Sequence, residues 1–189
     1  MKMKMKMITL ALFITAATAW SQSNITKIDI EQSEIQWLAK KVTGQHNGTI
    51  NLSDGSLEMN MDQITGGSFT VDMSSIVCKD LTGEYKGKLE GHLKSDDFFG
   101  VEKFPKALLT ITKSEMKMKN HYMMEGDLTI KGITNPISFE MHVEGNSATT
   151  KLIVDRSKFD VRYGSNSFFD NLGDKAIYDD FELDVNLKF

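Results

Sequence analysis

The sequence contains a single cysteine, Cys78, so no disulfide can form within the chain. Its apolar neighbour Val77 favours a small buried residue at this position over a reactive thiol. The core must therefore be held together by side-chain packing and strand pairing alone.

Motifs for catalysis and for cofactor binding are also missing. The sequence has no H-x-H or H-E-x-x-H zinc spacing, no phosphate-binding loop, no dinucleotide fingerprint and no G-x-S-x-G nucleophile turn. The four histidines are scattered along the chain and have no cysteine partner. These absences predict no metal site and no cofactor, and they argue against an enzyme.

A second long apolar run is absent as well, although the N-terminus has one short run at Ile8–Ala19. Three lysines precede it and an A-x-A pattern ends it, which is typical of a secretory signal peptide. The run is too short to span a membrane. We therefore predict a signal peptide at 1–21, cleaved after Ala19 or Ser21, and a soluble periplasmic or secreted domain at 22–189.

The predicted mature domain has few basic residues. Loss of the three lysines leaves 19 of the 22 basic residues against 26 acidic ones, which shifts the formal net charge from −4 to −7. The remaining lysines and arginines form no stripe. This charge argues against nucleic acid as a partner and against anionic membrane surfaces.

Alternation of apolar and polar residues is the dominant pattern of the mature domain. Gly126–Val143 contains two alternating halves around Gly132–Pro136, where the residues favour a turn. This predicts an antiparallel strand pair, which is too small to be stable alone. The last nine residues, from Phe181 to Phe189, alternate most regularly, with every second residue apolar.

Shorter signals divide the rest of the chain. Asp54-Gly55 predicts a hairpin turn, and Gly66-Gly67 is interpreted as a break between two strands. Asp80–Leu93 has helical spacing, and Ser95-Asp96-Asp97 resembles the start of a second helical turn. That turn carries Phe98-Phe99, which we expect to pack against a sheet or over the end of a barrel.

The chain thus contains about eight or nine strands and one short helical insert. Every clear strand has one apolar and one polar face, which predicts an all-β fold. A closed antiparallel barrel satisfies this pattern without an exposed edge, and a two-sheet sandwich satisfies it equally. Eight methionines follow the signal peptide. They fit either an interior that adapts to a ligand or an ordinary filled core.

Four motifs in order along the mature chain resemble the YceI-like family. They are H-L-K-S-D-D-F-F (His92–Phe99), K-F-P (Lys103–Pro105), G-D-L-T-I-K-G-I-T-N-P-I (Gly126–Ile137) and V-D-R-S-K-F (Val154–Phe159). The resemblance implies an extended lipocalin-like antiparallel β-barrel, exported to the bacterial periplasm. It also implies a long apolar ligand inside the barrel, either a polyisoprenoid or a fatty-acid-derived lipid, and no established catalytic residues.

Large apolar side chains are therefore the candidate ligand contacts. The residues expected to line the tunnel are Trp37, Phe69, Phe139, Met141, Phe159, Phe181 and Leu183, with Phe98 and Phe99 near the helical insert. His46, His92 and Arg156 are the candidates for a polar head group. Each of these three has an equally good structural interpretation, as turn packing, helix support or a salt bridge.

Two other functions remain open at this point. A barrel filled by its own side chains would serve as a stress-response or structural protein without a ligand. An enzyme that acts on a lipid or isoprenoid would need polar groups converging inside the barrel, and no such set is evident. The sequence also leaves open which lipid binds and whether the protein forms a homodimer.

Overall fold

The computed structural model describes residues 24–61 and 63–189, so the predicted signal peptide at 1–21 lies outside the described residues. The described strands are β1 Asn24–Lys27, β2 Glu34–Lys41, β3 Gly44–Asn60, β4 Gln63–Cys78, β5 Lys106–Met118, β6 His121–Ile130, β7 Ile133–Glu144, β8 Ser147–Asp155 and β9 Ile177–Lys188. The helices in this part of the chain are α1 Gly83–Lys94 and the short 3₁₀ helices η1 Arg156–Phe159 and η2 Gly173–Lys175.

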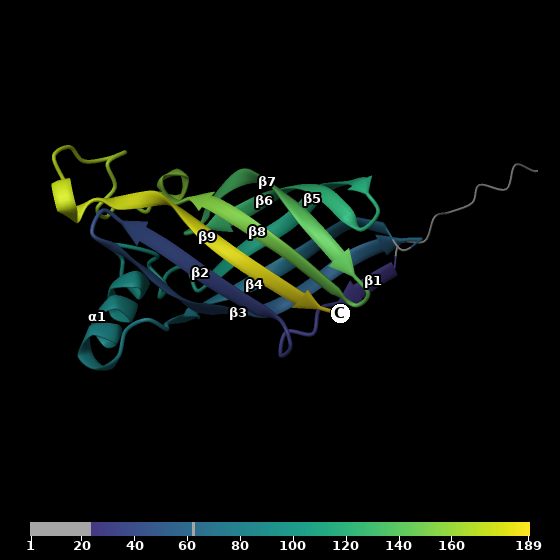
Figure 1. The fold of residues 1–189 in the computed structure, drawn as a ribbon, viewed down its shortest axis with the longest axis horizontal. Helices are drawn as coiled ribbons and strands as arrows, with labels where there is room; N and C mark the ends of the chain where they lie inside the picture. Colours follow the sequence, from purple (N-terminus) through teal and green to yellow (C-terminus); the bar gives the residue numbers. More distant parts are fainter. Residues whose placement is uncertain (1–23, 62) are drawn as a thin grey trace, which may run out of the picture.

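The strands form one antiparallel sheet that closes into a barrel (Figure 1). From β2 to β9 each strand pairs with the next one in sequence, and pairing of β9 with β2 closes a ring of eight strands. Strand β1 pairs with β3 outside this ring. Closure leaves the ring no free edge, which a sandwich would have. The barrel prediction is thereby confirmed.

Alternation along each strand sends apolar side chains into the barrel. In β6, for example, Tyr122, Met124, Leu128 and Ile130 are buried, while Glu125 and Asp127 point to the solvent. A strand with one wet face needs this alternation because successive side chains point to opposite sides of the sheet. The apolar core therefore lies inside the barrel.

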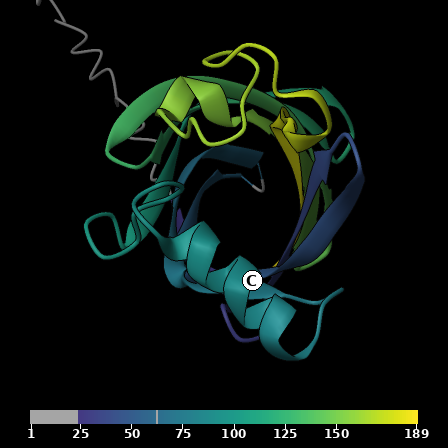
Figure 2. The ribbon, with the colours of Figure 1, turned by 90° about the vertical axis from the view of Figure 1, so that its left-hand side faces the viewer.

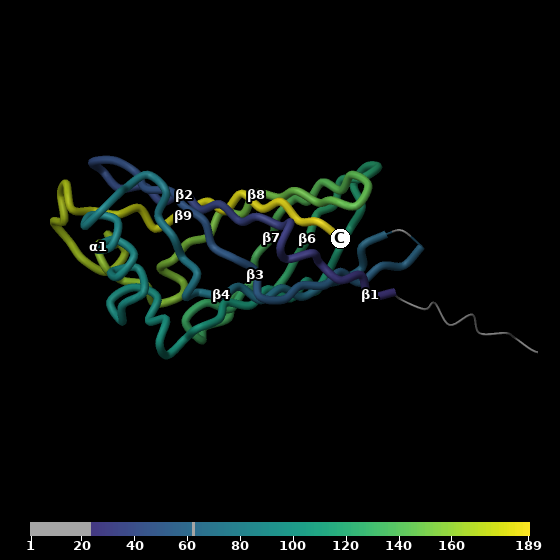
Figure 3. Tube along the Cα trace, turned by 90° about the horizontal axis from the view of Figure 1, so that it is seen from below, coloured from purple at the N-terminus to yellow at the C-terminus, as the bar shows by residue number. Residues whose placement is uncertain are grey.

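The two ends of the barrel differ. Helix α1 and both 3₁₀ helices lie at one end, which we call the α1 end, as the view along the barrel in Figure 2 shows. Strand β1 and the C-terminal residue lie toward the opposite end (Figure 3). The α1 end is thus the end where the chain departs from simple hairpins.

The helix predicted at Asp80–Leu93 is confirmed as α1, but it is held loosely. None of its residues is buried, and a Cβ on Gly87 or Gly91 would meet no atom within 4 Å. One anchor is Glu90, whose Oε1 accepts a 2.8 Å hydrogen bond from the backbone N of Cys78 at the end of β4. None of the described helices is long and apolar enough to cross a membrane.

The second helical turn predicted from Ser95 is wrong. Ser95 ends α1 instead, because its Oγ donates a 2.7 Å hydrogen bond to the backbone O of His92. The chain then makes an irregular turn that carries Phe98 and Phe99. The expectation that this pair packs over the end of a barrel is confirmed, as the cavity described below makes clear.

The hairpin predicted at Asp54-Gly55 is also wrong, since both residues lie inside β3. A Cβ on Gly55 would lie 3.0 Å from Ile28 Cγ1, and the N–H of Ile28 donates a 3.0 Å hydrogen bond to the backbone O of Gly55. Glycine here permits close approach of the segment between β1 and β2, which contains Ile28. Glycine often has this role within strands.

The prediction of a break at Gly66-Gly67 is wrong for the same reason, because both glycines lie within β4. A Cβ on Gly67 would lie 2.8 Å from the backbone O of Ser56 on β3. Residues 42–43 form the turn between β2 and β3, and β3 begins at Gly44. Both long strands are therefore continuous through their glycines.

The turn between β6 and β7 is shorter than predicted. Lys131 and Gly132 have positive φ angles of 53° and 76° and form a two-residue turn. Pro136 lies within β7, opposite Asp127 of β6. Strand β8 pairs with only the last four residues of β7, which begin at Met141. Pro136 thus sits where β7 has no β8 partner, so its missing N–H breaks no ladder on that side.

Strand β8 ends at Asp155, and the apolar residues Phe159 and Val161 lie beyond it. The Asp155 side chain accepts hydrogen bonds from the N–H and the hydroxyl of Ser157, at 3.0 and 2.6 Å, and this starts η1. An aspartate at a helix start competes with strand pairing for the backbone N–H groups. The chain therefore leaves the sheet at Arg156.

Candidate ligand-binding cavity

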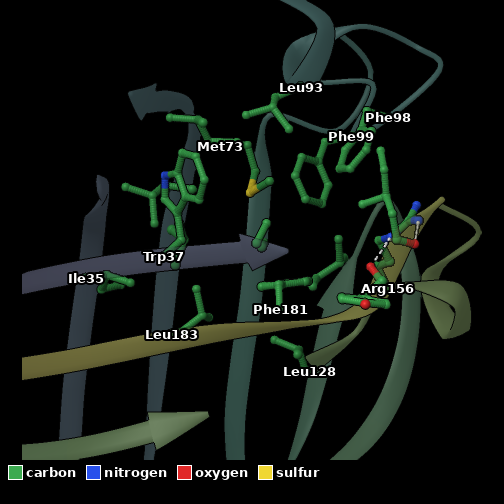
Figure 4. Close-up of a pocket in the computed structure, with 18 residues that line it drawn as sticks. Ile35, Trp37, Met73, Leu93, Phe98, Phe99, Leu128, Arg156, Phe181 and Leu183 are labelled. Atoms are coloured by element: carbon green, nitrogen blue, oxygen red, sulfur yellow. Dashed lines mark hydrogen bonds between the residues drawn. The ribbon is translucent and has the colours of Figure 1, made fainter. Parts of the chain in front are cut away.

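An apolar cavity lies inside the barrel at the α1 end (Figure 4). The volume of the cavity is about 130 Å³. Its wall consists of Ile35, Trp37, Ala39, Ile50, Val71, Met73, Ile76, Leu93, Phe98, Phe99, Ala107, Leu128, Ile130, Arg156, Ile177, Tyr178, Phe181 and Leu183.

Small inward-facing residues at the α1 end leave this space. Ala39 of β2 and Ala107 of β5 face the cavity where the opposite half of the barrel has large side chains. In that half Leu57 and Met124 are completely buried and Met141 is 2% exposed. The barrel is therefore filled at one end and hollow at the other.

The segment after α1 closes the hollow end with aromatic side chains. The rings of Phe98 and Phe99 meet edge to face with centroids 5.0 Å apart, and Phe99 meets Phe181 of β9 at 6.5 Å. Leu93, from the last turn of α1, also faces the cavity (Figure 4). The cover over the cavity is thus apolar and comes from the helical insert.

The surface of the cavity is entirely apolar. Trp37 contributes its ring, and its Nε1 is buried without a hydrogen-bond partner. Among the described residues, no three His, Cys, Asp or Glu side chains come together as they would around a metal ion. This wall can hold hydrocarbon, and it exposes no polar atom to the cavity.

Arg156 lies in the wall, yet its guanidinium is already satisfied. Four N–H groups donate to backbone oxygens, of Tyr178 from Nε at 3.2 Å, of Val161 and Tyr163 from Nη1 at 2.9 Å, and of Ile177 from Nη2 at 3.0 Å. The side chain is only 3% exposed. Arg156 therefore ties the segment after β8 to the start of β9.

The remaining N–H group of Arg156 faces a carboxylate. Nη2 lies 3.3 Å from Asp179 Oδ1, close enough for an ion pair but misaligned for a hydrogen bond. Burial lowers the pKa of Arg156, and the nearby Asp179 and Asp155 act to raise it. The salt bridge expected for Arg156 thus forms across to β9. The one N–H group without a hydrogen bond is paired with this carboxylate, and no polar atom of the wall is exposed to the cavity.

The structure places half of the twelve candidate residues in the cavity wall and the other half elsewhere. Those in the wall are Trp37, Phe98, Phe99, Phe181, Leu183 and Arg156. Four others are buried in packed parts of the core outside the wall: Phe69, Phe139, Met141 and Phe159, the last of which belongs to η1. Whether any of these residues contacts a ligand remains a prediction.

The two candidate histidines lie outside the cavity wall. His92, on α1, meets the rings of Tyr163 and Phe98 edge to face at 4.3 and 5.7 Å, and its Nε2 is buried without a partner. His46 Nδ1 lies 2.8 Å from Asp80 Oδ2 at the start of the helical insert. Both contacts match the structural interpretation of these residues, as helix support and turn packing.

Asp80 connects His46 to the end of β4. Burial acts to raise its pKa, but hydrogen bonds from the Asn47 N–H, from His46 and from the Cys78 thiol together lower it to about 2. The pKa of Cys78 is raised, mainly by burial and by its hydrogen bond to Asp80. Cys78 is completely buried, so its prediction as an internal residue is confirmed.

Sequence reasoning did not select several wall residues, among them Met73, Leu128 and Ile130. All three share the inward parity of their strands, so the signal of alternation was present for each. What the sequence lacks is their position along the barrel axis. Only strand register decides which inward residues lie at the hollow end.

The fold and the site together define a class of protein: a closed, eight-stranded antiparallel barrel with an apolar cavity beneath a helical insert. The model of the YceI-like domain matches residues 27–189. The chain belongs to this family, as the motifs in the sequence predict.

Curated relatives match over shorter stretches. A UPF0312 protein of Shewanella denitrificans is 26% identical over 98 residues, which cover 52% of this chain and 49% of that protein. A UPF0312 protein of Staphylococcus aureus is 39% identical over 84 residues, covering 41% of this chain and 46% of that protein. The chain thus spans about half the length of the curated relatives it matches.

Solved structures share the fold at low sequence identity. BcnA of Burkholderia cenocepacia has a TM-score of 0.68 and 18% identity, with 85% of this chain and 98% of that chain covered. A polyisoprenoid binding domain from Saccharophagus degradans has a TM-score of 0.56 and 11% identity, with 88% and 97% covered. At these identities the similarity establishes the fold alone.

Proposed function

We propose that this protein is an exported binding protein that holds the hydrocarbon part of a polyisoprenoid or fatty-acid-derived lipid in the barrel cavity. The observation that carries the proposal is a hollow with an entirely apolar wall beneath an apolar cover. The polyisoprenoid binding domain of Saccharophagus degradans, which shares the fold, supports the same ligand class.

The wall chemistry indicates how such a ligand would lie. Because no polar atom of the wall faces the cavity and the Arg156 guanidinium is engaged by backbone oxygens and Asp179, only the hydrocarbon end of the lipid fits inside. The polar end would remain at the opening, near water. Recognition would then rest on buried length and shape rather than on a head group.

Affinity should accordingly follow chain length. Each additional buried methylene contributes about 0.8 kcal/mol, or roughly a fourfold gain in affinity. The gain should stop once the hydrocarbon fills the space that Phe98 and Phe99 enclose. A longer chain would have to displace this cover.

The predicted signal peptide at 1–21 supports export to the periplasm or to the outside of the cell, where water separates membranes. A barrel that shields hydrocarbon there would serve to carry, store or sequester a lipid. The proposal contains no catalytic step, because the cavity wall exposes no polar atom to the ligand.

Native mass spectrometry of protein purified without detergent tests the proposal. A retained apolar molecule, exchangeable for added polyprenyl alcohol, is the expected result. A linear-alcohol series should then give rising affinity up to a plateau, read from the emission of Trp37 in the cavity wall. Absence of any bound lipid, together with flat affinity across the series, would overturn it.

A ligand-free structural role is the second candidate, because half of the barrel is already filled by Leu57, Met124 and their neighbours. This role predicts that the cavity is a packing imperfection of no consequence. Filling it by mutation would then raise stability and change nothing else. Turnover of a retained lipid would instead indicate an enzyme.

A further inference from the structure

An irregular segment at residues 162–176 follows η1 and exposes several aromatic side chains. Tyr163, Phe168 and Phe169 have 49%, 39% and 49% of their surfaces accessible to solvent. The exposed part of these two adjacent phenylalanines gains no burial within its own chain. Clustered exposed apolar side chains of this kind mark an interaction surface.

The segment is held rigidly in this exposed position. Its centre is Ser165, which is completely buried and whose backbone O accepts hydrogen bonds from the N–H groups of Phe168 and Phe169, at 3.2 and 3.0 Å. Ser165 Oγ accepts a 3.1 Å hydrogen bond from the Ser167 N–H, and Ser167 Oγ donates a 2.6 Å one to Asp179. The aromatic exposure is therefore built into the loop.

The same segment adjoins the cavity wall at the α1 end of the barrel. Arg156, a wall residue, donates from Nη1 to the backbone O of Tyr163 at 2.9 Å. The ring of Tyr163 meets His92 of α1 at 4.3 Å, next to Leu93, which faces the cavity. In Figure 2 the segment lies across the barrel opening from α1.

We propose that Tyr163, Phe168 and Phe169, here called the aromatic lip, dock the barrel opening onto the interfacial region of a lipid bilayer. This inference rests on the proposed function, because it names where the cavity meets its ligand. The apolar wall admits hydrocarbon, and hydrocarbon chains of lipids are found in bilayers because they are excluded from water. Aromatic side chains on a polar backbone suit the head-group level of a membrane.

The charges of the segment indicate which bilayer it fits. Arg162 and Lys175 are balanced by Asp170 and Asp174, so residues 162–176 carry no formal net charge. Arg162 also pairs with Asp160, and its guanidinium lies 5.1 Å from the centre of the Phe168 ring. Docking should therefore work on neutral phosphatidylcholine and depend little on salt, unlike binding by a basic patch.

The test compares two double variants of the mature protein. Phe168→Ser with Phe169→Ser removes the lip, and Met116→Ser with Met118→Ser removes two exposed apolar side chains from β5, toward the opposite end of the barrel. The first measurement is co-sedimentation with phosphatidylcholine vesicles at low and high salt. The second is the rate at which retinol moves from vesicles to the protein, read by energy transfer from Trp37.

The lip variant should lose about tenfold or more in vesicle binding and in transfer rate, because two phenylalanines no longer enter the interface. It should still take up retinol added directly from ethanol, as the wild type does. The methionine variant should match the wild type in every measurement. Salt should change vesicle binding of the wild type by less than about twofold.

Three results would overturn the inference. One is a lip variant that binds vesicles and takes up retinol from them as fast as the wild type. Another is wild-type binding that needs anionic lipid and disappears at high salt. The third is a wild-type dimer that the lip substitutions dissociate, which would assign the lip to a second copy of the chain. Failure of the wild type to bind retinol from ethanol would instead contradict the proposed function.

Discussion

The rings of His92 and Tyr163 meet edge to face with their centroids 4.3 Å apart, and this contact joins α1 to the segment after β8. The two elements are far apart in sequence and cover the same end of the barrel (Figure 2). Helix α1 buries none of its own residues, so it is held by this contact, by the Glu90 hydrogen bond to Cys78 and by Leu93, which packs against the core.

Filling the cavity should abolish ligand binding without unfolding the barrel. Ala107→Phe adds a phenyl ring on an inward-facing wall position of β5, where open space is available. We expect loss of lipid from native mass spectra and a stability change of less than about 1–3 kcal/mol, the usual range for added core volume.

Leu108→Phe is the matched control, since the neighbouring side chain points outward and is 43% exposed. This variant should retain the lipid. Equal retention by both variants would mean that the ligand, if any, lies outside this cavity.

Removal of the Arg156 side chain should cost stability rather than ligand specificity. Arg156→Met leaves four backbone oxygens and Asp179 without their buried partner. Loss of one member of a buried charged pair costs about 3–5 kcal/mol, which urea unfolding would measure.

Arg162→Met serves as the comparison, because Arg162 pairs with Asp160 at the surface with 60% of its side chain exposed. Exposed pairs contribute about 0–1 kcal/mol. If Arg156→Met remained as stable as Arg162→Met but lost its lipid, Arg156 would be a head-group ligand after all.

Two glycine substitutions should have opposite effects. A Cβ on Gly48 would lie 1.8 Å from the backbone O of Val77 and 2.7 Å from the Trp37 ring, so Gly48→Ala must push β3, β4 and the indole apart. Gly87→Ala in α1 meets no atom within 4 Å. Alanine should stabilise the helix there by about 0.5–1 kcal/mol.

Thermal unfolding and the emission of Trp37 distinguish these outcomes. Gly48→Ala should lower the melting temperature by several degrees and shift the tryptophan spectrum. Gly87→Ala should raise the melting temperature slightly and leave the spectrum unchanged. An unchanged spectrum for a folded Gly48→Ala protein would show that this packing is looser than the structure indicates.

Acid should weaken the barrel partly through Asp80. Its pKa is lowered from an ordinary 3.8 to about 2 in the folded protein, so the unfolded state binds more protons between these values. The stabilisation is therefore fully present above about pH 4 and is lost as the pH falls toward 2. Asp80 lies at the surface, so solvent screening should keep this contribution to about 1 kcal/mol or less.

Urea unfolding of the wild type and of Asp80→Asn across this pH range would measure the effect. The stability gap between them should be largest near neutral pH and should shrink as the pH falls toward 2. A gap that stays constant with pH would assign the acid sensitivity to other carboxylates.

Much of the fold followed from alternation. The inward parity of residues such as Leu128 and Phe181 is visible in the sequence, since each strand has one wet face, and so is the helical insert before Phe98. The pattern misleads at two glycines. Gly55 predicts a hairpin turn and Gly67 a break between strands, but each lies within a strand and permits close contact between neighbouring chain segments. A glycine has the same letter in both roles, and only the neighbouring strand reveals which one applies.

The candidate site was half predicted. Trp37 and Phe181 were correctly expected to face inward, but so were Phe139 and Met141, which lie in the packed half of the barrel. Parity fixes the direction of a side chain, not its depth along the barrel. Arg156 was recognised as noteworthy, yet its partners Val161 and Tyr163 and the start of β9 become neighbours only after the chain leaves the sheet.

The sequence by itself determined an all-β chain of alternating strands, one helical insert and membership of the YceI-like family, because these depend on local periodicity and short motifs. The tertiary structure decided where the barrel is hollow, because that depends on which strands are registered beside the small residues Ala39 and Ala107. It also decided that Arg156 is a structural tie and that the aromatic lip adjoins the cavity wall. Both follow from contacts between distant segments, which periodicity does not encode.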